Sequence, residues 1–597
     1  MGLLQKAVET YERHFAYASR HLTDSAMMAP VGHIVTRADL EITLDGDGRF
    51  VGAAEVDKSE PKIVIPATES SAGRTSAPCA HPLCEQLGYL LPENKTKYGL
   101  YTAQLAAWAD SPYSHPKLKP ILQYVQSGTV LSDLLRCGLI KQKEDGSLEN
   151  DKLLIRWRVL GEETEACWLD VTLFDAFTRY YTANHKGEPA LCMVSGQEAS
   201  PAEQHPKGII PINGNAKLIS ANDSNGFTYR GRFSEEWQAA VVSYEASQKA
   251  HNALRWLVQE QSVILGGRTF LCWNPQGKPT AMPTNPIFRP QKPVFRPSDY
   301  REALKKALNS RKAELTVTDS VVIAVLDAAT AGRLSLTYYN ELQGHDFLQR
   351  LHDWDESCCW MHRFYGIQTP TLRQIIDCAF GTERHEKNSA RMETDDRILR
   401  QQMQRLVSCR VDRRPIGTDI VKALFNRASN AQAYERPVWE TILFTACAVI
   451  RKYRKDRFKE EWSMALEPEK RDRSYQFGRL LAIMEKAERD TYGPNEDREP
   501  NAMRIQSVFC RRPFYAANQL EKQLDQAYFP RLKPGLRRWY KDMMGQIMAV
   551  IGTFPQEDWN KPLEDSYLMG YYLQRNALYA KKSDNEMEDM NDEQPEE

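Results

Sequence analysis

The sequence predicts an α+β protein, with a mixed α/β N-terminal domain followed by a helical, bundle-like C-terminal domain. Residues 1–300 are rich in β-branched runs and turn dipeptides, whereas the segments after Tyr300 repeat apolar residues with the helical period. Hydrophobic residues make up 42% of the 597 positions and charged residues 26%, which is typical of a globular chain and too apolar for a disordered one.

Two hairpins and two helices are predicted in the N-terminal domain. Apolar residues alternate around Asp45-Gly46-Asp47-Gly48, and a second alternating run breaks at Gly266-Gly267; both are hairpin signatures. The predicted elements, in chain order, are a helix at Leu3–Tyr17, a hairpin at Ile34–Val56, a strand at Lys62–Pro66, a helix at Glu245–Gln259 and a hairpin at Val263–Trp273. A proline-rich linker or surface loop is predicted over Pro275–Pro297.

Helices are predicted throughout the C-terminal part, because apolar residues recur with helical spacing and the connections carry Gly and Pro. The expected helices are Arg301–Ser310, Thr371–Phe380, Asp395–Ser408, Asp419–Ala428, Pro437–Arg457, Ser474–Thr491, Pro513–Ala527, Pro534–Ile551 and Asp565–Ala580. We therefore expect four parts: the α/β domain at 1–300, a helical middle region at 301–472, a helical bundle at 473–582 and an acidic disordered tail at 583–597.

The charge of the chain is unevenly distributed. The net charge is −1, with 78 basic and 79 acidic residues, but 8 of the acidic residues lie within 584–597. The remaining chain carries 79 − 8 = 71 acidic residues and is therefore at +7. A modestly basic body is compatible with nucleic-acid contact and excludes a strongly basic binder as a description of the whole chain.

Targeting signals are not evident, and a cytoplasmic protein is expected. Residues 1–20 contain Glu9, Glu12 and Arg13 where a secretory signal needs an apolar region, and the longest apolar stretches are far short of a membrane span. Twelve cysteines without a CxxC pair are typical of free thiols in a reducing compartment.

Two sequence patterns contain residues that could bind a metal ion, but neither pattern supplies a complete set of ligands. The pairs His345-Asp346 and His352-Asp353 could bind a divalent ion for phosphodiester hydrolysis, although such a site needs further ligands. A helix cap or an aromatic cluster is the more ordinary explanation. Cys79, His81 and Cys84 are ligand-type residues in one loop, but no second pair lies at a suitable distance, so unligated thiols are favoured. P-loop, GxGxxG, HExxH and GxSxG signatures are missing from the sequence.

Basic segments with interleaved aromatics are more frequent in the helical part. Arg451–Lys459 has six basic residues, with Tyr453 and Phe458 among them, and further arginines lie in 410–414, 504–512 and 531–538. Arg and Lys neutralise phosphates and aromatic rings can stack on bases, although any one such segment is more often a solvated helix face. We assign Arg451, Lys452, Arg454 and Lys455 as candidate contacts to a nucleic-acid strand.

Small polar loops are the second candidate feature, this time in the N-terminal domain. Residues 70–76 follow the predicted strand, and residues 213–217 and 222–226 precede Arg230 and Arg232. Such loops allow close approach to a nucleic-acid backbone or a base edge, although most are ordinary surface loops.

Long segments of the chain resemble a known family. They are GNAKLISANDSNGFTYRGRF from Gly214 to Phe233, SQKAHNALRWL from Ser247 to Leu257, the stretch Ser335–Trp360, YQFGRLL from Tyr475 to Leu481, and GYYLQRNALY from Gly570 to Tyr579. They occur in the expected order over nearly the whole chain. In these segments the sequence closely resembles the large subunit of the type I-C CRISPR surveillance complex (Cascade).

The resemblance implies a protein that catalyses no reaction and takes no cofactor or metal. It would read the protospacer-adjacent motif (PAM) in double-stranded target DNA, help to unwind the target, hold the displaced strand and support recruitment of a separate helicase–nuclease in trans. The other implied partners are the crRNA, the Cascade backbone subunits, the crRNA-processing subunit that holds the 5′ handle, and a small subunit. That small subunit is made by internal translation of the same gene, with Met464 or Met484 as a suitable start.

The resemblance also implies where the PAM is read. Arg74, Thr75 and Ser76 match the family's PAM-reading loop, although relatives often have Asn and Gly where this chain has Ser76 and Ala77. Asn213, Asn215 and Lys217 are assigned to the same task by their polar loop, and Arg230 and Arg232 to backbone contacts. Two alternatives stay open: a metal-dependent HD-type nuclease that uses His345, Asp346, His352 and Asp353, and a purely structural scaffold.

Overall fold

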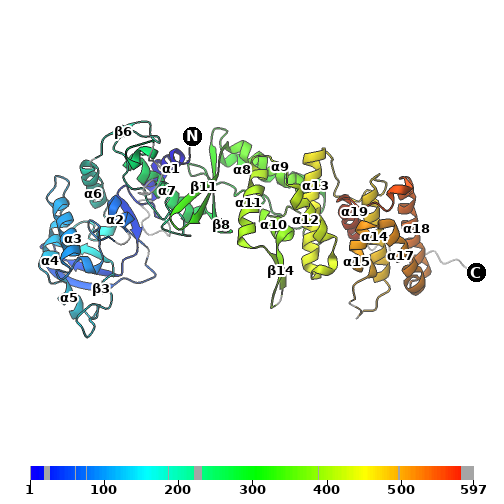
Figure 1. Cartoon of the computed structure of the whole chain (residues 1–597), viewed down its shortest axis with the longest axis horizontal. Coiled ribbons are helices and arrows are strands. Elements are labelled where there is room, and N and C mark those ends of the chain that lie inside the picture. Colours follow the sequence, from blue (N-terminus) through cyan, green and yellow to red (C-terminus); the bar gives the residue numbers. More distant parts are fainter. Residues whose placement is uncertain are drawn as a thin grey trace, which may run out of the picture. The chain divides into compact units, whose positions relative to one another are not determined.

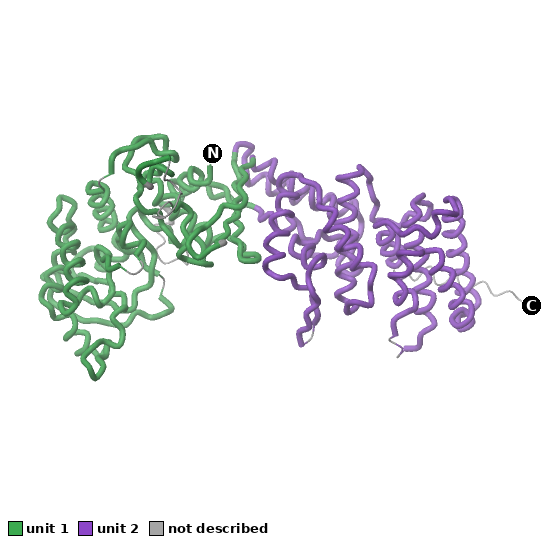
Figure 2. The backbone as a smooth tube through the Cα atoms, viewed as in Figure 1, with its two compact units in different colours: residues 1–280, 319–342 green, residues 281–318, 343–597 purple. Residues whose placement is uncertain are grey.

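The computed structural model describes residues 2–18, 27–60, 62–74, 77–185, 187–220, 232–387, 389–494, 496 and 498–579. Helices hold 49% of the chain and strands 15%, which confirms the predicted α+β class. The chain divides into two compact units (Figure 1, Figure 2): unit 1 comprises residues 1–280 and 319–342, and unit 2 comprises residues 281–318 and 343–597. A segment of the expected helical middle region thus belongs to unit 1.

Unit 1 contains several small sheets rather than one large one. In its three-stranded sheet β2 lies between β3, which is antiparallel to it, and β5, which is parallel. The first hairpin turns at Gly48, which has a positive φ of 78°, and Asp45 Oδ1 accepts the N–H groups of Asp47 and Arg49. The strands are β1 (His33–Thr36), β2 (Leu40–Leu44), β3 (Phe50–Glu55), β4 (Ile63–Pro66), β5 (Ile155–Val159), β6 (Ala190–Leu191) and β7 (Glu198–Ala199).

A four-stranded antiparallel sheet in the order β11-β10-β9-β8 completes the strands of unit 1. The second predicted hairpin is β8 (Val263–Leu265) and β9 (Arg268–Trp273), and both turn residues, Gly266 and Gly267, have the positive φ that such a two-residue turn requires. Sequence reasoning missed the long hairpin of β10 (Ser320–Thr330) and β11 (Arg333–Gln343). Its β-branched residues Val322 and Ile323 pair with β9 and are buried.

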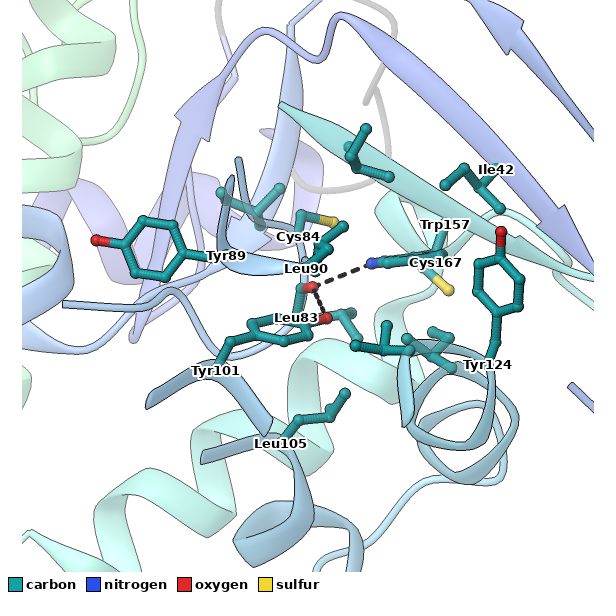
Figure 3. Packing of buried hydrophobic residues seen from close by; sticks show 14 of the residues in the cluster. Ile42, Leu83, Cys84, Tyr89, Leu90, Tyr101, Leu105, Tyr124, Trp157 and Cys167 are labelled. Carbon is teal, nitrogen blue, oxygen red and sulfur yellow. Dashed lines mark hydrogen bonds between the residues drawn. The ribbon is translucent and has the colours of Figure 1, made fainter. Parts of the chain in front are cut away.

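Unit 1 has more helices than the two that the sequence predicts. They are α1 (Leu3–Ala18), α2 (Glu69–Gly73), α3 (Lys95–Ala109), α4 (Leu118–Gln126), α5 (Val130–Arg136), α6 (Val171–Asn184) and α7 (Tyr244–Gln261). The extra helices α3 to α6 cover the three-stranded sheet and form a core in which Tyr101 Oη and Trp157 Nε1 both donate to the carbonyl of Leu83, at 2.7 and 3.0 Å (Figure 3). The predicted helices α1 and α7 pack with β9 and β10 in a second core.

Over its described residues, unit 2 is mostly helical and has two short hairpins. Its helices are α8 (Pro297–Glu314), α9 (Gly344–Ser357), α10 (Leu372–Phe380), α11 (Asp396–Val411), α12 (Thr418–Ala428), α13 (Arg436–Phe458), α14 (Arg473–Arg489), α15 (Asn501–Arg504), α16 (Gln506–Arg511), α17 (Pro513–Gln523), α18 (Pro534–Ile551) and α19 (Ser566–Tyr579). Its hairpins are β12 (Trp360–His362) with β13 (Gly366–Gln368), and β14 (Thr382–Glu386) with β15 (Ser389–Glu393). The nine expected helices of this part all have a counterpart here.

Helices α14 and α19 approach each other backbone to backbone. Gly478 of α14 lies against the backbone of Tyr567, and a Cβ added to Gly478 would collide with the Tyr567 carbonyl oxygen. Reciprocally, a Cβ on Gly570 of α19 would collide with the carbonyl oxygen of Tyr475. Two of the segments that carry the family resemblance are therefore the two sides of one helix crossing, which we call the glycine crossing.

Candidate nucleic-acid interface

Two of the predicted loops meet at a cavity within unit 1. The cavity has a volume of about 470 Å³ and brings Arg74, at the end of α2, together with Asn215 and Lys217. Its lining is mostly polar or small; the lining residues are Ser70, Gly73, Arg74, Ala77, Cys79, Ala202, Glu203, Gln204, His205, Lys207, Asn215, Lys217, Ile219, Ser220, Trp237 and Ala240. We call this the unit 1 cavity.

Arg74 closes α2 and is fixed by a buried carboxylate. Its Nη1 and Nη2 donate to Oε2 and Oε1 of Glu85 at 2.6 and 2.8 Å, and Nη1 also donates to the carbonyl of Cys79 at 2.7 Å. The Glu85 side chain is fully buried and that of Arg74 is 17% exposed. Because both carboxylate oxygens are engaged by the fork of the guanidinium, Arg74 anchors its loop and does not offer a free cation to a ligand.

The loop at 213–217 is anchored on the hairpin of β10 and β11. Asn213 has the left-handed φ of 53°, which suits Asn, and its Nδ2 donates to the carbonyl of Ala328 at 3.2 Å. The Lys217 N–H donates to the carbonyl of Gly332, and the Lys217 carbonyl accepts the N–H of Leu334. Asn213 and Asn215 are exposed, so this loop presents amides that the sheet holds in place.

A network behind the cavity wall holds the segment at 205–207. Arg255 of α7 donates through Nη2 to the carbonyl of Lys207 and through Nη1 to Asn252 Oδ1, and burial lowers the pKa of its guanidinium to about 10. His205 Nδ1 lies 2.9 Å from Ser247 Oγ, and burial lowers the pKa of His205 to about 4. His205 is therefore neutral at pH 7 and contributes polarity to the cavity without charge.

The remaining site residues predicted in unit 1 lie partly inside and partly outside the described residues. Thr75, Ser76 and Arg230 lie outside the described residues, and Arg232 is described and exposed. Sequence reasoning missed Gln204, Lys207 and Trp237, which line the same cavity. These residues stand in segments without a motif, and only the fold brings them to the loops that the sequence singled out.

The basic segment of α13 makes its contacts inside unit 2. Arg454 is 8% exposed; its Nε lies 2.7 Å from Asp565, its Nη1 2.9 Å from Glu460 and its Nη2 3.2 Å from Glu564. Arg451 donates to the carbonyls of Trp462 and Glu356 at 3.0 and 2.7 Å. In this arrangement both guanidiniums stabilise the helical unit.

The two lysines of the segment also have partners. Lys452 is buried, pairs with Asp456 at 2.8 Å and lies 4.8 Å from the ring centroid of Trp354. Lys455 is partly exposed and pairs with Glu461 at 3.0 Å. Of the four, Lys455 is the one placed for a contact with solvent or a strand, so strand contacts of this segment stay a prediction.

The two His-Asp pairs lie on α9 and are engaged separately. His345 Nε2 is 2.8 Å from the carbonyl of Leu315, and Asp346 pairs with Arg350 at 2.7 Å. Burial raises the pKa of the Asp353 carboxyl, but its neighbours His352, Gln349 and Arg413, the last at 2.9 Å, outweigh burial and lower that pKa to about 2. Over the described ranges, no group of three or more His, Cys, Asp and Glu is placed to hold a metal ion.

The cysteine-rich loop next to the cavity is occupied by hydrogen bonds and packing. His81 Nδ1 lies 2.9 Å from Ser71 Oγ, and burial lowers the pKa of His81 to about 4. Cys84 is fully buried in the core of unit 1. Cys192 lies apart from this loop and accepts the N–H of Ser243 at 3.2 Å. These contacts give each group a structural role.

The chain as a whole has two further properties that bear on its class. Among the helices that the structure describes, none is both long and apolar enough to cross a membrane. Residues 8–579, which are nearly the full length of the chain, match the profile of the CRISPR-associated protein family Cas_Csd1. The chain belongs to the Cas_Csd1 family. Membership in Cas_Csd1 makes it a CRISPR-associated protein of the Cascade large-subunit type. No curated protein matches the chain.

Proposed function

We propose that this Cas_Csd1 protein is the PAM-reading large subunit of a type I-C surveillance complex and cleaves nothing itself. It binds double-stranded target DNA beside the PAM, helps to open the duplex and holds the displaced strand. The crRNA supplies the remaining sequence specificity by base pairing. Its partners are the crRNA, the Cascade backbone and 5′-handle subunits, an internally translated small subunit, and a helicase–nuclease recruited in trans.

The observation that carries this proposal is the unit 1 cavity. Segments that are far apart in the sequence, at 70–79, 202–207 and 215–220, converge there with amide, hydroxyl and cationic side chains. Amides can pair with base edges and cations with phosphates. Gln204 and Asn215 are exposed at this cavity, so they are the side chains best placed to touch DNA without disturbing the fold.

The test is a binding titration of the reconstituted crRNA complex against one target duplex with a randomised three-base flank. Wild type is compared with Gln204→Ala/Asn215→Ala at fixed salt, because phosphate contacts make affinity salt-dependent. Gln123→Ala/Gln126→Ala, which removes two exposed amides of α4, is the matched control. Arg74→Ala is less suitable because it would leave the buried Glu85 carboxylate without its cation.

Wild type and control are expected to select the same flank, and the double variant to assemble but lose that selection. Selection that persists in the double variant would move the reading site elsewhere in the chain. Equal binding of all flanks by wild type would contradict PAM reading and favour the scaffold alternative. Cleavage of single-stranded DNA by the chain alone with a divalent metal, abolished by His352→Ala, would favour the nuclease alternative.

A further inference from the structure

The unit 1 cavity is concave, and this shape limits how it can meet DNA. Base edges of an intact duplex lie at the bottom of a groove about 8.5 Å deep, so a protein reads them with an element that projects into the groove. The exposed amides of Gln204 and Asn215 can face such a groove, but the interior of the cavity cannot enter it. The interior instead accepts a group that projects from the nucleic acid, and an unstacked base is such a group.

The size of the cavity suits one such group. Its volume of about 470 Å³ lies in the lower half of the range found for small-ligand pockets, roughly 300–1,000 Å³. A duplex does not fit in this space, whereas a single base with its sugar does. The lining also mixes an indole with amides and a lysine, which is the combination that single-stranded nucleic acids require.

Trp237 supplies the surface for stacking. It stands in η3 (Glu236–Ala240), a short helical turn whose start is fixed because Gln238 Oε1 accepts the N–H groups of Ser234 and Glu235 at 3.0 and 3.1 Å. Directly after this turn, the Val241 carbonyl accepts the N–H of Met193 at 2.8 Å. The backbone of the turn that carries Trp237 is therefore held on both sides by hydrogen bonds that a ligand does not need to break.

The polar groups around the indole match the other parts of a nucleotide. Gln204 and Asn215 each carry one amide donor group and one acceptor, as the edge of a base requires. Lys207 Nζ donates to the Arg74 carbonyl at 3.3 Å, and an ammonium has two more N–H groups for a phosphate. The backbone carbonyl of Lys207 is held by the half-buried Arg255, so the backbone that carries this cation is fixed before any ligand binds.

We propose that the unit 1 cavity receives one extruded nucleobase of the displaced DNA strand, stacked on Trp237 and contacted at its edge by Gln204 and Asn215. The inference rests on the function proposed above, because opening the duplex beside the PAM is what leaves a base of that strand without a partner. Capture of this base would keep the two strands from closing again.

The test combines a substitution in the protein with one in the DNA. The reconstituted complex is titrated with target duplexes that carry one abasic site, moved in turn through the first positions of the displaced strand. At one position the abasic site is expected to weaken binding by wild type about tenfold, since stacking of one base has that order of effect. In Trp237→Ala the same abasic site should change binding less than twofold, and Trp237→Phe should retain part of the base dependence.

Two further variants separate capture of a base from a folding defect. Ala77→Trp adds a bulky side chain to the lining but removes no other lining side chain, and it should abolish the base dependence in the same way. Tyr113→Ala truncates an exposed aromatic elsewhere in unit 1 and should keep it. Assembly with the crRNA and circular dichroism establish that each variant is folded.

An abasic penalty that is equal in wild type and Trp237→Ala at every position would overturn the inference. A base dependence found instead in the crRNA 5′ handle would also overturn it, because the captured base would then be RNA. Flank selection is measured on the same complexes. If it persists while the coupling to Trp237 is absent, the inference fails and the proposed function stands. If wild type shows the coupling but selects no flank, the PAM-reading function fails.

Discussion

Lys207 of the unit 1 cavity and Arg454 of α13 are both cations in the sequence, but they differ in their surroundings. At the cavity, Lys207 donates to the backbone carbonyl of Arg74. In α13, Arg454 is held by the carboxylates of Glu460, Glu564 and Asp565, the last of them 111 positions away. The comparison teaches that the number of cations in a segment does not measure the charge offered to a ligand, because distant carboxylates decide how much of it is used inside the fold.

The largest expected effect is on the stability of the two units at acidic pH, where unit 1 should lose more stability than unit 2. Burial holds the pKa values of four histidines of unit 1, His33, His81, His205 and His251, at about 4, 4, 4 and 3. The unfolded chain binds more protons than the folded one between these values and about 6.5, so unit 1 loses stability as the pH falls through this window. The loss at pH 5 is roughly 2 kcal/mol for each fully buried histidine.

Unit 2 has an opposite response at its most buried acid. Burial raises the pKa of Asp355 to about 6, so its contribution to stability is present below about 4 and is lost as the pH rises through 6. Hydrogen exchange of the full chain at pH 7 and pH 5 measures both units at once. Protection should fall in α1, α3 and α7 more than in α13 and α14, and an equal fall in both units would contradict the comparison.

The second largest effect is expected at the glycine crossing. In Gly478→Ala the new methyl group meets the Tyr567 carbonyl, so α14 and α19 must move apart and unit 2 should lose more than about 3 kcal/mol of stability. Thermal or denaturant unfolding of the chain measures this loss. Gly545→Ala, in open space on α18, is the matched control and should stabilise by up to about 1 kcal/mol through its helix propensity.

Truncation of Arg454 tests whether the cations of α13 are structural. Arg454→Ala leaves the carboxylate of Asp565, which is only 17% exposed, without its cation and is expected to destabilise unit 2 by about 3 kcal/mol. Lys455→Ala, one residue along, should cost less than about 1 kcal/mol because its pair with Glu461 is near the surface. If Arg454→Ala instead leaves stability unchanged and weakens DNA binding by the assembled complex, α13 is a strand-binding surface after all.

The smallest effect on stability is expected at the cavity. Asn215→Ala removes an exposed amide and should change the free energy of unfolding by less than about 0.5 kcal/mol. Its consequence should appear in the flank selection of the assembled complex. Asn215→Ala should alter flank selection without loss of stability, and Arg454→Ala should lower stability without altering flank selection. Together these two outcomes would establish the contrast between the two regions.

Local signals predicted much of the fold. The hairpin at Gly266-Gly267 follows from two adjacent positions with positive φ, and the helices of unit 2 follow from apolar periodicity. The β10–β11 hairpin was missed because its apolar run is as short as a buried helix turn, and its pairing with β9 depends on residues about 50 positions away. Long-range pairing of this kind leaves no periodic signal.

The candidate site was predictable only in part. The loops around Arg74 and Asn215 were singled out by composition and by the family resemblance, but nothing in the sequence joins them to Trp237 or Gln204. The pairing of Arg74 with Glu85 was also not predictable, because the same arginine would look equally available in an open loop. The cavity is defined by segments that the fold brings together, and the residue types of those segments do not reveal this in the sequence.

The glycine crossing also bears on where the internally translated small subunit proposed above would begin. Ribosomes that initiate at Met464 would translate both sides of the crossing, so Gly478 and Gly570 would meet as they do in the full chain. Initiation at Met484, inside α14, would omit Gly478 and Tyr475 and leave that face of α19 uncovered. The close approach of two helix backbones thus favours initiation at Met464 over Met484. A packing constraint in the protein becomes a constraint on where translation of its messenger RNA starts.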